Sequence, residues 1–292
     1  MHLTFNRQLS SKRLRDSQSQ VRILTHHGFT LVELVVVITI VGILAGGVAL
    51  FIGRPTQSFF DTERRADLSD RADTALRRIA RDIRNALPNS VRITTSGADS
   101  LLEFTPVINA GRYRAEAGTS ATDNPLDFSN PADTSFNILG SAMTVANSDS
   151  LVIYNLGIAG ADVYEGSNRR LLNSASNSNT LSFTGSSFPL SSPSSRFYVV
   201  SNPVTYACDM TNRVLWRYQG YAFQATQPAS IATLDGLPSV QRHQLANNLS
   251  SCQITYTAGI LQRSGIVFIN ISMIEDSAKV TLMHQINVAN SP

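Results

Sequence analysis

One long apolar segment near the N-terminus stands apart from the rest of the chain. From Phe29 to Ile52 the sequence runs for 24 residues with Glu33 as its only ionisable side chain. About 20 consecutive apolar residues suffice to cross the hydrocarbon core of a bilayer as a helix. The pattern therefore predicts a membrane-spanning helix over residues 29–53. A carboxylate inside such a helix costs about 2.5–3.5 kcal/mol, which makes Glu33 a candidate functional residue.

Beyond Gly53 and Pro55, which we expect to end the apolar helix, the pattern becomes amphipathic. Apolar residues recur at spacings of three and four, as on one face of a helix: Ala72, Leu76, Ile79, Ile83 and Leu87. Acids precede arginines by four residues, the favourable order along a helix: Asp61 and Arg65, Asp67 and Arg71, Asp73 and Arg77. Residues 54–88 are therefore predicted to form an amphipathic helical extension that ends near Pro88.

From residue 89 to 292 helical periodicity gives way to short runs rich in Val, Ile, Tyr and Phe, which are typical of strands. Ten strands are predicted: Val91–Thr94, Leu101–Thr105, Ser150–Asn155, Thr180–Phe183, Arg196–Ser201, Val204–Cys208, Val214–Tyr218, Cys252–Tyr256, Ile266–Ile274 and Lys279–Val288. Residues 106–148 and 173–195 are rich in small polar residues and read as long surface loops. The expected fold class is α+β, a long helix packed on one mostly antiparallel β head.

Positive charge is concentrated in the first 28 residues. This tail holds five basic residues and one acidic residue, a net +4, whereas the remainder has 19 basic and 20 acidic residues, a net −1. The positive-inside rule keeps such a tail in the cytoplasm and sends the head across the membrane. A body without a basic face does not favour nucleic-acid binding.

The two cysteines, Cys208 and Cys252, both lie in the exported part of the chain. An even pair outside the cytoplasm favours one disulfide, which would close a loop of 44 residues. Two separate buried thiols are the alternative.

The sequence carries no pattern typical of an enzyme. His243 and His284 are far apart, and there is no Cys-x-x-Cys pair, nucleophile elbow or phosphate-binding glycine loop. The expectation is a protein without catalytic residues, metal or cofactor.

The junction between the tail and the apolar run has an unusual form. In a secretory signal the small residue at the cleavage site follows the apolar core, but here Gly28 precedes it. An uncut signal anchor would explain the apolar run, but not the order Gly28-Phe29-Thr30-Leu31-Val32-Glu33-Leu34. That run resembles the cleavage and methylation motif of type IV prepilins and of type II secretion pseudopilins.

The resemblance implies a basic leader over residues 1–28, cut by a prepilin peptidase between Gly28 and Phe29, and N-methylation of Phe29. It also implies that Glu33 pairs with the N-terminal amine of a neighbouring subunit, since buried charges offset their desolvation when paired. The implied partners are the prepilin peptidase, major and minor pilins bound through the N-terminal helix, and an inner-membrane assembly platform. The implied location is the bacterial inner membrane with a periplasmic head, and then the filament or its tip.

A second resemblance lies in the head. The runs Arg196–Ser201, Pro203–Cys208 and Leu215–Tyr218 are similar to biogenesis protein O of the mannose-sensitive haemagglutinin pilus. The C-terminal runs Gly265–Val267 and Val288–Asn290 resemble a wider group of minor pilins and pseudopilins. These likenesses imply a minor pilus subunit. A type II secretion pseudopilin and a tip adhesin that binds a glycan or a surface through its head loops remain as alternatives.

Overall fold

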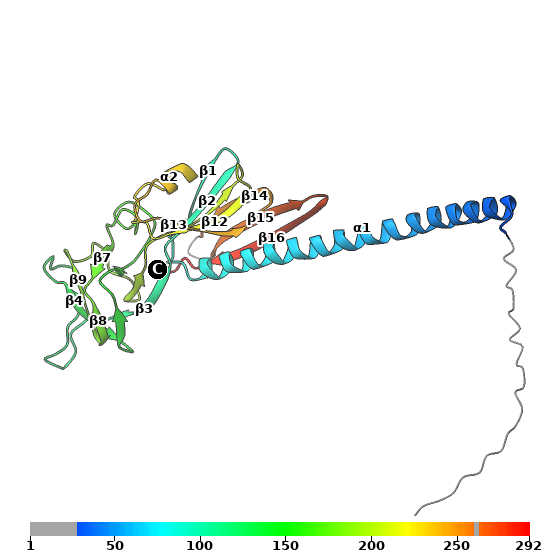
Figure 1. Ribbon diagram of the computed structural model, residues 1–292. Helices are drawn as coiled ribbons and strands as arrows, with labels where there is room; N and C mark the ends of the chain where they lie inside the picture. The colour runs from blue at the N-terminus through cyan, green and yellow to red at the C-terminus, as the bar shows by residue number, and fades with distance from the viewer. Residues whose placement is uncertain (1–27, 260–262) are drawn as a thin grey trace, which may run out of the picture. The chain divides into compact units, whose positions relative to one another are not determined.

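The computed structural model describes residues 28–259 and 263–292, and the chain divides into two compact units, Met1–Thr56 and Gln57–Pro292. A single long helix, α1 (Leu31–Arg84), contributes residues to both units (Figure 1). The expectation that Gly53 and Pro55 end the apolar helix is wrong, because both lie inside α1. A proline within a helix removes one backbone hydrogen bond, and the helical turns on both sides outweigh that loss here.

In the first unit, α1 exposes apolar side chains all round. Leu31–Ala49 is long and apolar enough to cross a membrane, with a mean hydropathy of 2.6 and no buried residue. Ile43 and Leu44, for example, are 75% and 62% exposed. Soluble proteins rarely expose so large a continuous apolar surface. This part of α1 therefore requires lipid or other protein around it.

In the second unit, α1 buries one apolar face. The burial of the predicted stripe is confirmed, since Ala72, Leu76, Ile79, Ile83 and Leu87 are all at most 2% exposed. However, α1 ends at Arg84 rather than near Pro88, so Leu87 lies beyond the helix. Leu68 and Ala75 extend the same face, and the stripe up to Ile83 joins a core shared with two sheets. Residues spaced by three and four lie one above another on a helix, so this spacing creates a continuous packing surface.

Ion pairs line the exposed side of this part of α1. Two of the three predicted pairs form, Asp67 with Arg71 and Asp73 with Arg77. The third differs from the prediction, because Asp61 pairs with Arg64 at 3.6 Å rather than with Arg65. Arg64 also lies 3.4 Å from Asp276 in the turn between the last two strands, so its position is set by two carboxylates.

Two antiparallel sheets pack with α1 around the larger core. The five-stranded sheet has the order β1 (Arg92–Ser96), β2 (Asp99–Phe104), β11 (Val204–Asp209), β12 (Val214–Gln219) and β13 (Gln241–Ala246). The three-stranded sheet has the order β14 (Leu249–Thr257), β15 (Gly265–Glu275) and β16 (Ala278–Val288). A short helix, α2 (Ile231–Asp235), connects β12 and β13. These elements form the part of the head that is directly supported by α1.

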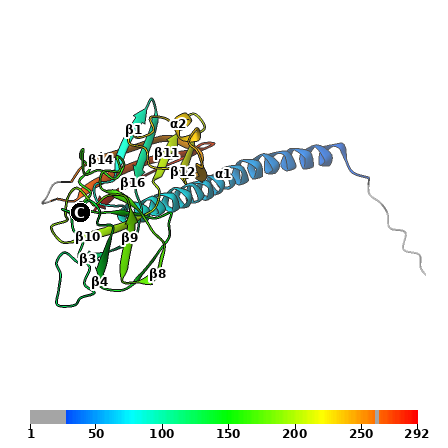
Figure 2. The same ribbon diagram turned by 90° about the vertical axis from the view of Figure 1, so that its left-hand side faces the viewer.

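A second group of strands is inserted between β2 and β11, which are neighbours in the five-stranded sheet. Six of its strands close a barrel: β10 (Arg196–Val200), β3 (Val107–Tyr113), β4 (Ser135–Leu139), β9 (Thr180–Thr184), β7 (Arg169–Leu172) and β6 (Ser150–Val152). A two-stranded ribbon adds β5 (Met143–Val145) and β8 (Ala175–Ser178). The barrel has its own aromatic core, with Phe136 and Phe197 ring centroids 5.3 Å apart. Figures 1 and 2 show the barrel and the sheets as separate groups of strands.

Each of the ten predicted strands overlaps a strand of the structure. The interpretation of residues 106–148 and 173–195 as loops is wrong in part, because they contain β3, β4, β5 and β8 in addition to the strand predicted at Thr180–Phe183. The error has a local cause: β8 reads Ala-Ser-Asn-Ser, and Gly111 interrupts β3. Phe197 covers that glycine from the partner strand, where a β-carbon in place of the glycine hydrogen would be only 2.8 Å from the ring. The expected single head therefore contains two sheets, a barrel and a ribbon.

Candidate functional site at the N-terminal junction

The expected cleavage junction lies just before the helix begins. Gly28, Phe29 and Thr30 precede α1 and are exposed, with Phe29 77% exposed. A peptidase needs access to the scissile backbone, which a helix would tie up in its own hydrogen bonds. The Gly28–Phe29 bond lies outside α1, so its backbone is not held in helical hydrogen bonds.

Thr30 caps the helix, and Glu33 lies in the first turn. The Glu33 N–H donates to Thr30 Oγ1 at 3.2 Å, and the Leu34 N–H donates to the Thr30 carbonyl at 3.1 Å. Threonine at the cap with glutamate three residues later is the spacing of a capping box. A carboxylate in the first turn is also favoured by the positive end of the helix dipole. The backbone of Glu33 therefore takes part in capping the helix, a detail that the sequence analysis missed although the Thr-x-x-Glu spacing was visible.

The same geometry suits the role implied for Glu33. The carboxylate is four residues from Phe29, so both belong to the same end of the helix. After a cut at Gly28, an amine and a carboxylate would stand at one end of an otherwise apolar helix. Such a pair of opposite charges offsets its desolvation only when the charges meet.

The comparison with known families bears on this segment. A model of the prokaryotic N-terminal methylation motif matches residues 24–49. The match supports a type IV pilin-like protein. It covers the junction and the apolar helix, whereas no curated protein and no solved structure matches the chain. The motif implies processing by a prepilin peptidase and assembly with pilins, and one apolar helix behind it fits a membrane-anchored pilin.

In the head, a disulfide joins the two sheets. Cys208 in β11 and Cys252 in β14 are bonded, with their Cα atoms 6.1 Å apart. Both side chains lie in the shared core, at 0% and 9% exposure. The bond ties the five-stranded sheet to the three-stranded sheet at the point where α1 packs on both.

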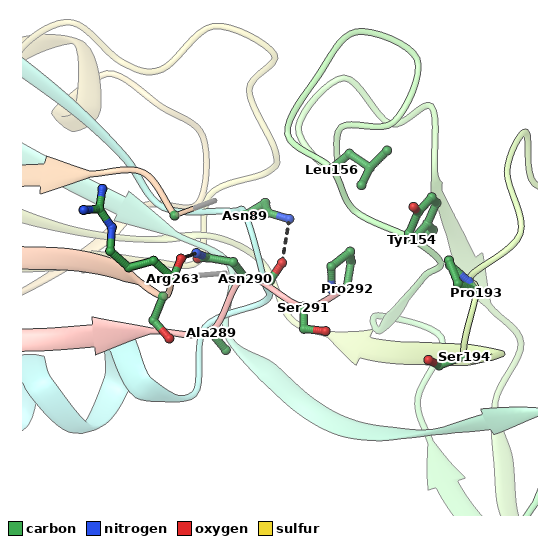
Figure 3. A pocket seen from close by; sticks show the side chains of 12 residues that line it. Asn89, Tyr154, Leu156, Pro193, Ser194, Arg263, Ala289, Asn290, Ser291 and Pro292 are labelled. Carbon is green, nitrogen blue, oxygen red and sulfur yellow. Dashed lines mark hydrogen bonds between the residues drawn. The ribbon is translucent and has the colours of Figure 1, made fainter. Parts of the chain in front are cut away.

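A cavity of about 650 Å³ opens beside the C-terminal residues (Figure 3). Asn89 donates to the carbonyls of Asn155 and Asn290, at 2.9 Å and 3.4 Å, and Asn290 donates to the Arg263 carbonyl at 3.0 Å. Arg263 and Tyr154 are the ionisable side chains among the described lining residues. The described part of the chain also places no group of three His, Cys, Asp or Glu side chains for a metal ion. The cavity wall offers amides and hydroxyls rather than an acid–base pair.

A buried carboxylate lies in β2 of the five-stranded sheet. Glu103 is fully buried and accepts hydrogen bonds from Arg92 Nε at 2.5 Å and from the Tyr221 hydroxyl at 2.9 Å. Burial raises the pKa of Glu103 above its ordinary value, against the opposing effect of the Arg92 charge. Arg92 also donates to the carbonyls of Gln224 and Ala225. The network fastens the segment after β12 to the sheet, which gives the buried carboxylate a structural role.

Proposed function

We propose that the protein is a minor, non-catalytic subunit of a type IV pilus of the mannose-sensitive haemagglutinin type, acting in filament assembly or at the filament tip. The matched motif, with an exposed Gly28–Phe29 junction directly before a fully exposed apolar helix, carries this proposal. The likeness of the head runs at Arg196–Cys208 to a pilus biogenesis protein supports the choice of pilus type.

In this proposal the chain is inserted in the inner membrane with its leader cytoplasmic and its head periplasmic. Prepilin peptidase cuts after Gly28, Phe29 is N-methylated, and the assembly platform extracts the helix into the filament. Glu33 then meets the amine of a neighbouring subunit. The apolar surface of Leu31–Ala49, exposed in the isolated chain, becomes buried against other pilin helices.

The substitution Glu33→Val tests the assembly step separately from processing. The variant is expected to be cut and to stay in the membrane, because the neighbouring amine loses its partner. Glu63→Val is a matched control, since Glu63 is exposed on the same helix and forms no ion pair among the described residues. The readout is the amount of processed protein in sheared filaments and in membranes. Equal incorporation of Glu33→Val and wild type would contradict the pairing role.

A type II secretion pseudopilin is the second candidate, because the matched motif lies in the segment that both filament classes share. Deletion of the gene distinguishes the two. A pilus subunit predicts reduced piliation and adhesion with normal exoprotein secretion. Lost secretion with intact pili would replace the pilus proposal by the pseudopilin.

A further inference from the structure

Two arginines lie directly opposite each other on the outer face of the barrel. Strand pairing places Arg112 of β3 against Arg196 of β10; Arg112 is exposed and Arg196 is half-buried. Like charges directly opposite in a sheet are destabilising. Within residues 28–259 and 263–292 neither forms an ion pair, whereas the nearby Arg114 is 3.1 Å from Asp123. Arg196 makes only a long hydrogen bond, 3.5 Å, to the neutral Ser291 hydroxyl.

The surface around this pair is hollowed. A depression of about 320 Å³ is lined by both arginines together with Tyr198. A second depression of about 300 Å³ shares Ala110 and Gly111 with the first, and its wall is neutral, with Asn109, Leu139 and Ser141. The two depressions adjoin at these shared residues of β3, and we call them together the trough, with a cationic end at the arginines and a neutral end at Leu139. Depressions of this size can hold a sugar-sized group.

The chemistry of the trough selects the ligand. A guanidinium binds a carboxylate or a sulfate through paired, charge-assisted hydrogen bonds, and an anion bound by both arginines would offset their mutual repulsion. The ring of Tyr198 and the 46%-exposed Leu139 offer apolar surface to the face of a sugar ring. A nucleic acid would need further basic contacts along its backbone, which the net charge of −1 outside the tail does not supply.

We propose that this trough binds an acidic polysaccharide. Arg112 and Arg196 hold a carboxylate or sulfate group, and the neutral depression takes the adjoining sugar. The binding would compensate the repulsion between the two arginines. The site lies in the inserted barrel and does not depend on whether α1 enters a filament.

The test uses the full-length protein in detergent micelles. Polygalacturonate, dextran sulfate and unmodified dextran are immobilised, and binding is measured at two salt concentrations. The double variant Arg112→Gln/Arg196→Gln is expected to lose roughly tenfold or more in affinity for at least one acidic polymer. The control Arg65→Gln/Arg78→Gln removes the same charge from exposed positions on α1 and should bind as wild type does. The first two polymers separate carboxylate from sulfate recognition.

A second variant keeps both arginines. Leu139 pairs with Arg112 across β4 and β3, so Leu139→Glu places a carboxylate beside the cations. It should abolish binding without lowering the melting temperature, because Leu139 is half exposed and a repulsion is relieved. The proposal would be overturned if the Arg112/Arg196 variant and the control lost equal affinity, or if Leu139→Glu bound as well as wild type does. It would also be overturned if unmodified dextran or poly-glutamate bound as tightly as the acidic polysaccharides.

Discussion

Removal of the disulfide should cost the head a large part of its stability. The substitutions Cys208→Ala and Cys252→Ala open a loop whose ends are 44 residues apart. Chain entropy in the unfolded state gives about 4 kcal/mol for a loop of this length. The second unit, about 240 residues, has an unfolding entropy of about 0.5 kcal/mol per kelvin. The melting temperature should therefore fall by about 8 °C.

The assay is thermal unfolding of the full-length protein in detergent, followed by near-ultraviolet circular dichroism of the buried tyrosines of the head. The melting temperature should fall by the same amount in each single variant as in the double variant, because either substitution removes the whole bond. Wild type kept under reducing conditions provides the control without any substitution. A loss of about 1 °C or less, or two single losses that add up in the double variant, would refute the reasoning.

Three further predictions concern single substitutions. Arg92→Gln should destabilise the head by about 3–5 kcal/mol at pH 8, because the buried Glu103 loses its charged partner. Burial raises the pKa of Glu103 above 4.5, so the stabilisation from its raised pKa is present below pH 4.5 and is lost as the pH rises through that pKa. The loss of unfolding free energy caused by Arg92→Gln, measured by urea unfolding, should therefore be smaller at pH 5 than at pH 8. Asp82→Ala should cost about 1.5–3 kcal/mol of unfolding free energy in the same assay, because the Tyr206 hydroxyl donates to Asp82 at 2.6 Å and would be left unpaired. The control Asp73→Ala, at an exposed ion pair, should cost under about 1 kcal/mol, and equal losses in the two variants would contradict this account. Gly28→Glu should leave an uncut precursor in the membrane fraction on an immunoblot, and normal processing would contradict the role of that glycine.

The local patterns predicted most of α1 and seven of the eight strands in the two sheets, but not β13, whose sequence Gln-Arg-His-Gln-Leu-Ala is mostly polar. The spacing from Ala72 to Ile83 directly encodes the buried face of a helix, and runs rich in β-branched and aromatic residues directly encode strands. Local runs predicted three strands of the barrel, β6, β9 and β10, but its closure has no local code, because β6 pairs with β10 some 50 residues later in the chain. Its strands include a β3 interrupted by glycine, and the ribbon beside it includes the exposed, polar β8.

The functional residues, too, could be predicted from the sequence only in part. The junction at Gly28 and Phe29 and the carboxylate of Glu33 could be predicted, because a motif is a local property of the chain. The opposition of Arg112 and Arg196 could not, since it depends on the register of two strands 84 positions apart. The burial of Glu103 was missed for a similar reason: an acid in a short strand reads as a solvent-facing residue until its partners are known.

The most direct test of the central claim is the intact mass and N-terminal sequence of the protein isolated from membranes, with and without prepilin peptidase. The account predicts a mature chain that begins at N-methylated Phe29 when the peptidase is present and an uncut chain when it is absent. A chain that begins at Met1 in both cases, or one cut after the apolar helix, would contradict the assembly of this protein into a pilin-like filament.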